Sequence, residues 1–497
     1  MSKRAGGALL PAFEEGPEAA EGPLYLRVYR RVRGAILDGS LAPGARLPST
    51  RTLAGELGVS RNTVELAFAQ LDTEGFLLRR VGAGSFVADV RPARPEPRPA
   101  RQTPAATPAR AASPVLSARG RMLAGAAEGA ESVATQAFAP CLPELSVFPH
   151  AAWHRLLARR SRRSGRALLA EVDPAGYRPL REAVAAHLGT SRGVRCDWRQ
   201  VVVLGSTQQA LDLAARLVLD PGDAAWIEEP GYMGARAALR NAGARLVPVP
   251  VDDQGIDVAA GERLEPAARL AYVTPSHQYP LGATLSLARR LALLGWAARA
   301  GAWIFEDDYD SELRYTGRPL AAVQGLDPAG RVIYAGTFNK ALFPSLRLAY
   351  VVVPDALVDA FASARTQTDG CPPALAQAVL ADFIADGHFG AHLRRMRAVY
   401  AERRMTLLDA VEMEVAPRVR LGPSDTGLHV AVWLPAGADD RRVSRAAAAR
   451  GLSLPPLSQY HLQTPSAPGL LLSYATVPAE AISRGVRTLR EVLDGVG

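Results

Sequence analysis

The stretch Tyr334-Ala-Gly-Thr-Phe-Asn-Lys-Ala-Leu-Phe-Pro-Ser-Leu-Arg-Leu-Ala-Tyr-Val-Val-Val-Pro354 links two apolar runs through a turn that contains a proline. It holds Lys340, one of only two lysines in a chain with 58 basic residues; the other is Lys3. Arginine therefore meets the ordinary surface-charge needs of this chain. A lysine kept beside an apolar strand indicates chemistry that needs an amine, because an amine can lose its proton and form a Schiff base whereas a guanidinium stays protonated. The alternative is a lysine that is only solvated on a loop.

The segments on both sides of this stretch predict the fold class. From about Ala139, short apolar runs alternate with helical patterns, which is typical of an α/β fold with a mostly parallel sheet covered by helices on both faces. A smaller α+β part follows. The expected strands are Val201–Leu204, Ala224–Ile227, Leu270–Val273, Trp303–Phe305, Val332–Tyr334 and Leu348–Val352, then Leu428–Trp433 and Leu470–Tyr474 in the smaller part. The expected helices include Gln208–Leu219, Leu287–Ala300, Ala374–Ala385 and Leu393–Val411.

Length and composition limit the classes of protein to which this chain can belong. A chain of 497 residues with 48% hydrophobic residues can build two or more domains. The longest apolar runs fall far short of a bilayer span, and no secretory leader precedes residue 24, so a cytoplasmic location without a membrane partner is expected. The three cysteines, Cys141, Cys196 and Cys371, are scattered without CxxC spacing. This spacing argues against a disulfide framework or a zinc site, and no metal is expected.

Two loops after predicted strands carry groups that suit a ligand. Ser206 and Thr207 stand between a strand and a helix, where amides and hydroxyls at a helix N-terminus suit a phosphate. The loop is no Walker A motif, and the chain has no GxGxxG in a βαβ unit. Tyr232 follows Pro-Gly after the next strand, where it can stack on a planar ring. A plain turn and a core or surface tyrosine are the alternatives.

Two further features complete the set. The run Phe305-Glu-Asp-Asp-Tyr-Asp310 puts carboxylates at a strand end; a metal site is the competing idea, but no histidine clusters with them and the glycine of a calcium loop is missing. Lys340 has Thr337 three residues before it and Arg347 seven residues after it. Pyridoxal phosphate needs these groups together: an amine for its aldehyde, a carboxylate for its ring nitrogen, hydroxyls and a guanidinium for its phosphate, and a face for its ring.

With these groups, the segment 139–497 resembles the fold-type I aminotransferase family. The motifs that carry the resemblance are Phe148-Pro149 with Trp153, Asp173-Pro-Ala-Gly-Tyr-Arg-Pro-Leu-Arg181, Glu229-Pro-Gly-Tyr232, Thr274-Pro-Ser-His-Gln-Tyr-Pro-Leu-Gly282, Glu306-Asp-Asp-Tyr-Asp-Ser-Glu312 and Gly336-Thr-Phe-Asn-Lys340. The resemblance implies that Lys340 holds pyridoxal 5'-phosphate as an internal aldimine. It implies that Asp307 pairs with the ring nitrogen and Tyr309 with the phenolic oxygen, with Tyr232 stacking. It also implies the remaining contacts: Ser206, Thr207, Thr337 and Arg347 to the phosphate, and His277 and Gln278 near a further oxygen.

The amino-terminal part predicts a different module. Three helical patterns are followed by two short strands around a glycine turn, and the second and third helices are joined by a short turn with Gly58. This spacing is typical of a helix-turn-helix with a wing. The expected elements are a helix from Leu24 to Leu37, a helix opened by Pro48-Ser-Thr50, a helix capped by Ser60, and strands at Gly75–Arg80 and Ser85–Val87 around Gly82-Ala-Gly84. The alternative is a helical interaction domain with a hairpin.

This module resembles the GntR-type winged helix over about residues 24–90. Leu47-Pro-Ser-Thr-Arg-Thr-Leu-Ala54 and Gly58-Val-Ser-Arg-Asn-Thr-Val64 carry the resemblance. It implies binding of double-stranded operator DNA, with residues at helix starts meeting bases and phosphates and the wing near the minor groove. The implied contacts are Arg51, Ser60, Arg61, Asn62, Thr63 and Gly82. Glu65 departs from this pattern, since an arginine there would suit DNA better.

Charge and composition divide the chain further. Residues 24–90 hold nine arginines against six acids, and residues 91–135 hold seven against three, so these parts contribute +3 and +4 to the formal net charge of +9. Repeated Arg-Pro, Pro-Ala and Ala-Arg in 91–135 show no apolar period and predict a semi-extended basic linker. The predicted domains are a disordered tail at 1–22, the winged helix at 23–90, the linker at 91–135 and the cofactor domain at 136–497.

As a whole the chain resembles the MocR/GabR subfamily of GntR regulators, which implies a head-to-tail homodimer. Three positions depart from the aminotransferase pattern: Glu171 where a tyrosine is common, Asn339 where a serine usually precedes the lysine, and Leu471 with Leu472 where an arginine commonly holds the substrate carboxylate. Loss of that arginine should weaken amino-acid binding by on the order of a few kcal/mol. Either another arginine substitutes, or the effector is not an ordinary α-amino acid.

Three functions compete on this sequence. The first is a transcription regulator whose cofactor domain senses an amine, an amino acid or a vitamer through Lys340. The second is a working aminotransferase with a DNA-binding arm, in which Lys340 is also the catalytic acid and base. The third is a DNA-binding scaffold without a cofactor. The missing arginine favours the first over the second, with little or no turnover, and the Lys340–Asp307–Tyr309 set disfavours the third.

Overall fold

The structure is a computed structural model that describes residues 23–80, 82–89, 116–125, 136–140, 142–163, 168, 170, 173–317, 320–416, 418–463 and 467–496. The chain divides into two compact units, Met1–Ala112 and Ser113–Gly497, each of which is described by itself. The division falls inside the predicted linker. The predicted tail at 1–22 and residues 91–115 and 126–135 of that linker lie outside the described residues.

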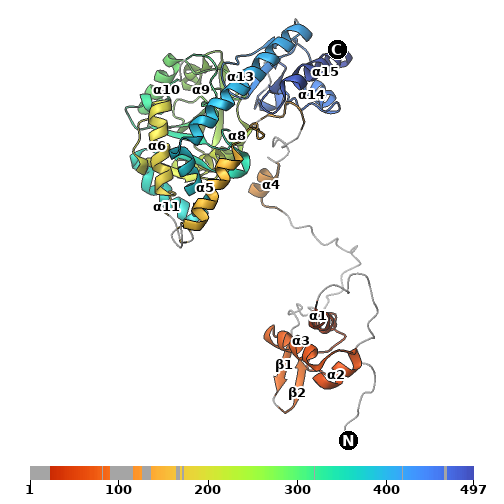
Figure 1. Ribbon diagram of the computed structural model, residues 1–497. Coiled ribbons are helices and arrows are strands. Elements are labelled where there is room, and N and C mark those ends of the chain that lie inside the picture. Colours follow the sequence, from red (N-terminus) through yellow and green to blue (C-terminus); the bar gives the residue numbers. More distant parts are fainter. Residues whose placement is uncertain are drawn as a thin grey trace, which may run out of the picture. The chain divides into compact units, whose positions relative to one another are not determined.

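The first unit is a three-helix domain with a two-stranded wing (Figure 1). Its helices are α1 (Leu24–Leu37), α2 (Thr50–Leu57) and α3 (Arg61–Thr73), and its strands are β1 (Leu77–Arg80) and β2 (Gly84–Val87), which pair antiparallel. Val32, Leu53 and Phe68 meet in one apolar core. Ser49 and Ser60 cap α2 and α3, each accepting a hydrogen bond from a backbone amide of the first turn. Gly58 adopts the left-handed conformation (φ 63°) that turns the chain between these helices.

The second unit is built on an eight-stranded sheet. The order is β3-β10-β9-β8-β7-β4-β5-β6, in which β9, β8, β7, β4 and β5 run parallel while β10 runs antiparallel to both β3 and β9. The prediction of a mostly parallel sheet is therefore confirmed. The strands are β3 (Val201–Leu204), β4 (Ala224–Glu229), β5 (Arg245–Asp252), β6 (Gly255–Ile256), β7 (Leu270–Val273), β8 (Trp303–Asp308), β9 (Val332–Thr337) and β10 (Ala349–Val352).

Helices cover both faces of this sheet, as predicted. Val201 and Val203 of β3 face one apolar core, and Val202 and Leu204 face the other, because side chains alternate along a strand. The first core includes α5 (His150–Arg163), α6 (Arg178–Arg192) and α12 (Ala374–Ala385). The other face is covered by α7 (Thr207–Val218), α8 (Met233–Asn241) and α11 (Val358–Thr368). The helices α9 (Val258–Leu264) and α10 (Leu287–Ala300) pack in a separate apolar core with residues of β4 and β5.

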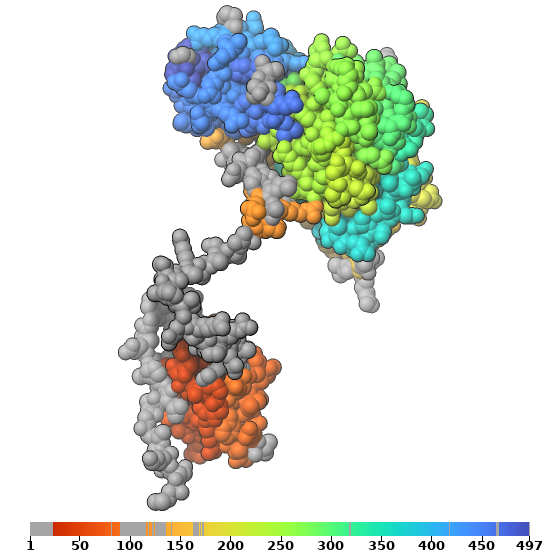
Figure 2. Space-filling view, turned by 180° about the vertical axis from the view of Figure 1, so that it is seen from behind, coloured from red at the N-terminus to blue at the C-terminus, as the bar shows by residue number. Residues whose placement is uncertain are grey.

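The carboxyl-terminal part forms its own lobe with a separate apolar core. The long helix α13 (His388–Glu414) runs from the sheet domain into this lobe, where it packs on α15 (Ala479–Val496) (Figure 1). Figure 2 shows the lobe in blue beside the green sheet domain. Its three-stranded antiparallel sheet consists of β11 (Arg420–Leu421), β12 (His429–Trp433) and β13 (Gly469–Ser473), with α14 (Asp440–Ala448) alongside. The α+β prediction for this part is confirmed; β12 begins one residue later than expected, and β13 is shifted by one residue toward the N-terminus.

One prediction for the segment 91–135 is wrong. Residues Ala118–Gly125 form the helix α4 and are not semi-extended. Ser117 caps it by accepting a hydrogen bond from the Gly120 amide (3.0 Å), and Arg119 donates to the Asn241 carbonyl at the end of α8. This contact with a distant helix stabilises a short helix whose sequence lacks an apolar period. Among the described residues, no helix is both long enough and apolar enough to cross a membrane.

Candidate functional site

A cavity of about 370 Å³ lies where the carboxyl ends of β3, β7, β8 and β9 meet. Polar side chains from loops that are far apart in the sequence line it. The lining residues are Ser206, Thr207, Gln208, Tyr232, Tyr272, Thr274, Tyr279, Asp307, Tyr309, Thr337, Asn339, Lys340, Pro344 and Arg347. Eight of the ten residues predicted to bind the cofactor are therefore brought together, and ligands of open α/β sheets commonly bind at this edge.

The antiparallel strand β10 brings Arg347 to this edge. Because β10 lies between β3 and β9 and runs against both, the residues just before its start at Ala349 meet the carboxyl ends of its neighbours. The Arg347 carbonyl accordingly lies close to Gly205. Arg347 thus shares one end of the cavity with the N-terminus of α7, where Ser206 is the cap residue and accepts from the Gln209 amide (3.1 Å). A guanidinium, hydroxyls and a helix N-terminus at one place suit a phosphate.

The three carboxyl groups of β8 have three different environments. Glu306 accepts hydrogen bonds from the Val323 and Gln324 amides (both 2.9 Å). Asp308 is bound by Arg192 (2.8 Å), and although burial opposes its charge, this guanidinium and hydrogen bonds from neighbouring hydroxyls hold the pKa of Asp308 below its ordinary value. Both side chains therefore have structural partners on one face of the strand. In the ranges given above, no three His, Cys, Asp or Glu side chains are grouped so as to hold a metal ion.

Asp307 points to the opposite face and into the cavity. It is only 6% exposed, and its Oδ2 accepts a hydrogen bond from the Tyr272 hydroxyl on β7 (2.8 Å). Burial raises the pKa of Asp307 to about 7, with the nearby Asp308 and Asp310 charges adding to the effect and the Tyr272 hydrogen bond and Lys340 opposing it. Within the described part of the chain, Oδ1 of Asp307 is buried without a hydrogen-bond partner.

Lys340 enters the cavity from the turn that follows β9. Its neighbours Phe338, Ala341 and Leu342 are buried, and they hold the turn against the apolar core. The backbone amide of Asn339 donates to the Thr337 hydroxyl (3.1 Å), which tightens the chain just before the lysine. The amine is thereby presented on a supported turn, as a residue with a fixed chemical task requires.

Tyr232 lies at the start of α8 beside two glycines whose lack of a side chain is needed. A Cβ atom at Gly234 would lie 2.5 Å from the Tyr232 ring, and one at Gly231 would lie 2.3 Å from the Glu228 carbonyl. Glu229 fixes the same loop by accepting from the Leu462 amide (2.8 Å) in the carboxyl-terminal lobe. Contacts from the sheet domain and from the carboxyl-terminal lobe thus hold the ring of Tyr232 at the cavity wall.

His277 and Gln278 do not line the cavity, whereas the next residue, Tyr279, does. His277 Nδ1 lies 2.9 Å from Asp310 Oδ2 and 3.0 Å from the Tyr309 hydroxyl. The Gln278 amide donates to the Pro230 and Tyr279 carbonyls (2.9 and 2.7 Å). Their contact with the cofactor stays a prediction.

The cavity also holds residues that sequence reasoning missed. Tyr279 stands directly before Pro280, and a tyrosine at such a turn was the available signal. Tyr272 sits in an apolar strand, where its sequence context does not distinguish it from a core residue. Thr274 opens one of the motifs that carry the family resemblance, but neither Thr274 nor Gln208 was assigned a role in the site. Glu171, where a tyrosine is common in the family pattern, lies outside the described residues.

The donor set fits pyridoxal phosphate. The buried, unpartnered Oδ1 of Asp307 can accept from a protonated ring nitrogen, and burial of an unpaired acceptor is costly without such a partner. The Tyr232 ring offers a stacking face, Lys340 offers the amine, and Arg347 with the N-terminus of α7 offers an anion site. Each requirement of the cofactor is met by a side chain in the same cavity.

In the winged helix, the predicted DNA contacts fall into two groups. Arg51, Arg61 and Asn62 are exposed at the starts of α2 and α3. Ser60 and Thr63 are joined by a hydrogen bond between their hydroxyls (2.8 Å), so both contribute to the α3 cap. Gly82 lies in the wing turn with φ 76°, a conformation that favours glycine.

Glu65, the departure noted in the sequence, has a partner on the wing. Its Oε1 lies 2.9 Å from Nη1 of Arg79 on β1. The pair links the middle of α3 to the wing, and as a largely exposed ion pair it stabilises the domain by at most about 1 kcal/mol. Glu65 is thus explained by a contact inside the domain.

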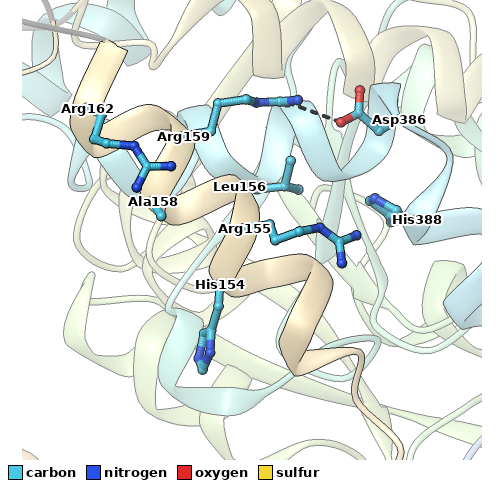
Figure 3. A pocket seen from close by; sticks show the side chains of 8 residues that line it. All are labelled: His154, Arg155, Leu156, Ala158, Arg159, Arg162, Asp386 and His388. Carbon is cyan, nitrogen blue, oxygen red and sulfur yellow. Dashed lines mark hydrogen bonds and ion pairs between the residues drawn. The ribbon is translucent and has the colours of Figure 1, made fainter.

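A second hollow lies on the surface of the sheet domain, over α5 (Figure 3). Its volume is about 730 Å³, and it shares no lining residue with the cavity around Lys340. His154, Arg155 and Arg162 line it from α5, while Arg159 is paired with Asp382 and Asp386 (2.8 and 3.1 Å). None of the predicted site residues lies here.

Comparisons with known families agree with the two-module organisation. The model of aminotransferase class I and II matches residues 147–489, and that of the bacterial regulatory proteins of the gntR family matches residues 24–87. Among similar proteins, the probable rhizopine catabolism regulatory protein MocR of Rhizobium meliloti is 41% identical over 471 residues, which are 95% of this chain and 94% of that protein. The pyridoxine biosynthesis transcriptional regulator PdxR of Corynebacterium glutamicum is 30% identical over 448 residues, 90% of each chain.

Solved structures resemble the second unit. The kynurenine aminotransferase of Pyrococcus horikoshii, in complex with PMP, is 28% identical with a TM-score of 0.69, over 77% of this chain and 95% of that one. The α-aminoadipate aminotransferase LysN of Thermus thermophilus, complexed with N-(5'-phosphopyridoxyl)-L-leucine, is 31% identical with a TM-score of 0.68, over 76% and 95%. The sheet domain and the carboxyl-terminal lobe thus have the fold-type I architecture that the sequence predicted.

Proposed function

The chain belongs to the MocR-type subfamily of the GntR transcription regulators, and from this premise we propose that its aminotransferase-like domain senses an amine through Lys340. The protein is a pyridoxal-phosphate-dependent, DNA-binding transcription regulator. One observation carries the sensing proposal: Lys340, Asp307 and the anion site around Arg347 share one cavity in a chain that also has a winged helix.

The proposed roles of the cavity residues follow from their positions. When bound, pyridoxal phosphate supplies an aldehyde that reacts reversibly with amines, and Lys340 is the residue that would hold it. Asp307 would keep the ring nitrogen protonated, and Tyr309 would face the phenolic oxygen. Ser206, Thr207, Thr337 and Arg347 would bind the phosphate, as their place in the cavity supports.

On the DNA side we assign the operator contacts to the exposed starts of α2 and α3. Arg51, Arg61 and Asn62 have the charge and exposure that phosphate and base contacts need. Ser60 and Thr63 hold the start of α3 in shape, and the turn at Gly82 would approach the minor groove. In this proposal residues 23–90 bind DNA, 91–135 connect, and 136–497 bind the cofactor.

The assembly and its location belong to the same proposal. We infer a head-to-tail homodimer, which the aminotransferase-like fold supports, and a cytoplasmic location, where a regulator of this kind meets its operator. A working aminotransferase is the alternative. Leu471 stands against it, because an apolar side chain cannot bind a substrate carboxylate.

A ligand screen on the full-length protein tests the proposal. Amines, amino acids and vitamers are added while the visible absorption of the bound cofactor and a gel shift on the protein's own upstream DNA are followed together. We expect at least one compound to change both signals. A colourless protein, or absorption changes that never alter DNA binding, would contradict sensing. Keto-acid formation in proportion to added amino acid would support the aminotransferase instead.

A further inference from the structure

We propose that the effector is a primary amine whose nitrogen-bearing carbon carries no carboxylate. This inference rests on the function proposed above and narrows its ligand. It follows from the distribution of positive charge in the cavity and from the apolar surroundings of Leu471, which stands where the family resemblance implies an arginine.

Arg347 is the one guanidinium among the described residues that line the cavity. It lies at the end formed by the N-terminus of α7 and the carboxyl end of β9, next to the Ser206, Thr207 and Thr337 hydroxyls. These groups together make the phosphate site, so Arg347 is committed to that anion. Lys340 is committed to the cofactor aldehyde. No cation of the described lining is then left for a second anionic group.

The rest of the lining includes four tyrosines, some of which pack against an apolar cluster. On β13 the side chains alternate, so Leu470 and Leu472 face the core of the carboxyl-terminal lobe while Leu471 faces the other way. Leu471 is fully buried in a cluster with Tyr279 and Tyr460. Tyr232 and Tyr309, which line the cavity, pack against the same cluster.

Arg236, which contacts Tyr460 of this cluster, already has partners. Arg236 on α8 donates to the Tyr460 carbonyl and to the Gly231 carbonyl (3.2 Å), and lies 3.9 Å from Glu229. It is buried and is not part of the cavity lining. The sequence left open whether another arginine replaces the missing one, and among the described residues no arginine besides Arg347 lines the cavity.

An α-amino acid would therefore place a carboxylate against the tyrosine rings of the lining, some of which pack on Leu471. Burying that charge without a cation is unfavourable, whereas an amine without the carboxylate meets only apolar and phenolic surface. The phenol groups can still accept or donate hydrogen bonds; the Tyr279 and Tyr460 hydroxyls lie 3.1 Å apart. The cavity thus matches amines with apolar or hydroxyl-bearing bodies.

The test compares matched pairs on the cofactor-loaded, full-length protein. Ethanolamine is paired with serine, histamine with histidine, and tyramine with tyrosine, and each compound is titrated while the visible band and operator affinity are recorded. We expect amines to change the band at concentrations about tenfold or more below those of their amino acids. Amino acids that act at equal or lower concentrations would overturn the inference, and so would a panel in which no amine changes the band. Amino acids that act at equal or lower concentrations leave the proposed function standing. A panel in which no compound changes both the band and operator affinity contradicts the proposed function as well, so the two failures are distinguishable.

A substitution at Leu471 tests whether this side chain sets the preference for amines. Leu471→Arg should lower the preference for amines over amino acids about tenfold, because it restores a guanidinium beside the cavity. Leu471→Met is the matched control, which keeps the volume and the apolar character and should keep the preference. An unchanged preference in a folded, cofactor-loaded Leu471→Arg protein would also overturn the inference. The wild-type panel remains decisive if the arginine variant does not fold.

Discussion

The buried carboxyl group of Asp307 lies at the cavity, whereas those of its neighbours Glu306 and Asp308 do not line it. Glu306 accepts hydrogen bonds from backbone amides, and Asp308 is paired with Arg192 although its Oδ1 has no hydrogen-bond partner. Asp307 has one hydroxyl partner and one unpartnered oxygen, and it alone of the three lines the cavity among the described residues. A protein retains such a group when a ligand completes it. The energetic cost in the cofactor-free chain makes this role measurable.

Asp307→Asn should change the pH dependence of stability in cofactor-free protein. Because the folded-state pKa of Asp307 is raised from 3.8 to about 7, the folded chain binds its proton more tightly than the unfolded chain does. The free energy of unfolding therefore falls as pH rises from about 4 to about 7, by on the order of a few kcal/mol from this group. The free energy of unfolding, measured in urea, should fall less between pH 5 and pH 8 in the variant than in the wild-type protein. Parallel losses in both proteins would contradict the prediction.

The two lysines provide a matched pair of variants. Lys340→Ala should abolish the visible absorption band of the bound cofactor, because the amine that holds the aldehyde is removed. Lys3→Ala should leave the band unchanged. Borohydride treatment followed by peptide mass mapping should place the cofactor on the peptide that contains Lys340. A band that survives in Lys340→Ala would mean that another group holds the cofactor.

The helix α3 is held in place by a local cap at its start and by a contact with the wing. Its start is fixed locally by the Ser60 cap, and its middle is tied to the wing by the Glu65–Arg79 pair. The first is a property of neighbouring residues; the second joins residues that lie 14 positions apart in the printed sequence. The helix start keeps Arg61 and Asn62 exposed.

Ser60→Ala should lower the stability of the winged helix by about 1 kcal/mol, because the Thr63 amide loses its side-chain acceptor. Thermal unfolding of the full-length protein, followed by a probe in this unit, measures the change. Ser40→Ala is a suitable control, since this serine lies in the turn after α1 and caps no helix. A loss of equal size in both variants would argue against the cap.

Arg61→Ala should weaken operator binding and reduce the salt slope of binding by about one, because one phosphate contact is removed. Arg155→Ala removes an exposed arginine from α5 of the other unit and serves as a control for total charge (Figure 3). Gel shifts at several salt concentrations measure both effects. If Arg155→Ala matched Arg61→Ala, general electrostatic attraction would explain the loss and the α3 assignment would be wrong.

For the whole molecule, sensing requires that cofactor-site ligands and DNA influence each other. Linkage makes this influence reciprocal: an effector that changes operator affinity by a given factor has its own affinity changed by the same factor. Titrating an active amine with and without saturating operator DNA should therefore give a ratio of dissociation constants equal to the ratio seen in gel shifts. Unequal ratios at equilibrium would show that the two measurements do not report one coupled system.

The sequence by itself determined much of this protein. The rarity of lysine singled out Lys340, the alternation of apolar runs predicted the sheet, and the capped helices and glycine turn predicted the winged helix. These are local patterns of spacing, capping and turn chemistry, and neighbouring residues suffice to express them. Eight of the residues predicted to bind the cofactor line one cavity in the structure.

Only the tertiary structure decided which groups face one another. The antiparallel direction of β10 carries Arg347 to one end of the cavity, and Tyr279 lines the cavity where His277 and Gln278 were expected. Leu471 packs against the tyrosines beside the cavity, and Arg347 is the one arginine of the described lining. Strand direction and neighbour order arise from hydrogen bonds between segments that are distant in the chain. A pattern within one segment carries no record of those partners, so the shape and charge of the ligand site emerge only when the sheet is assembled.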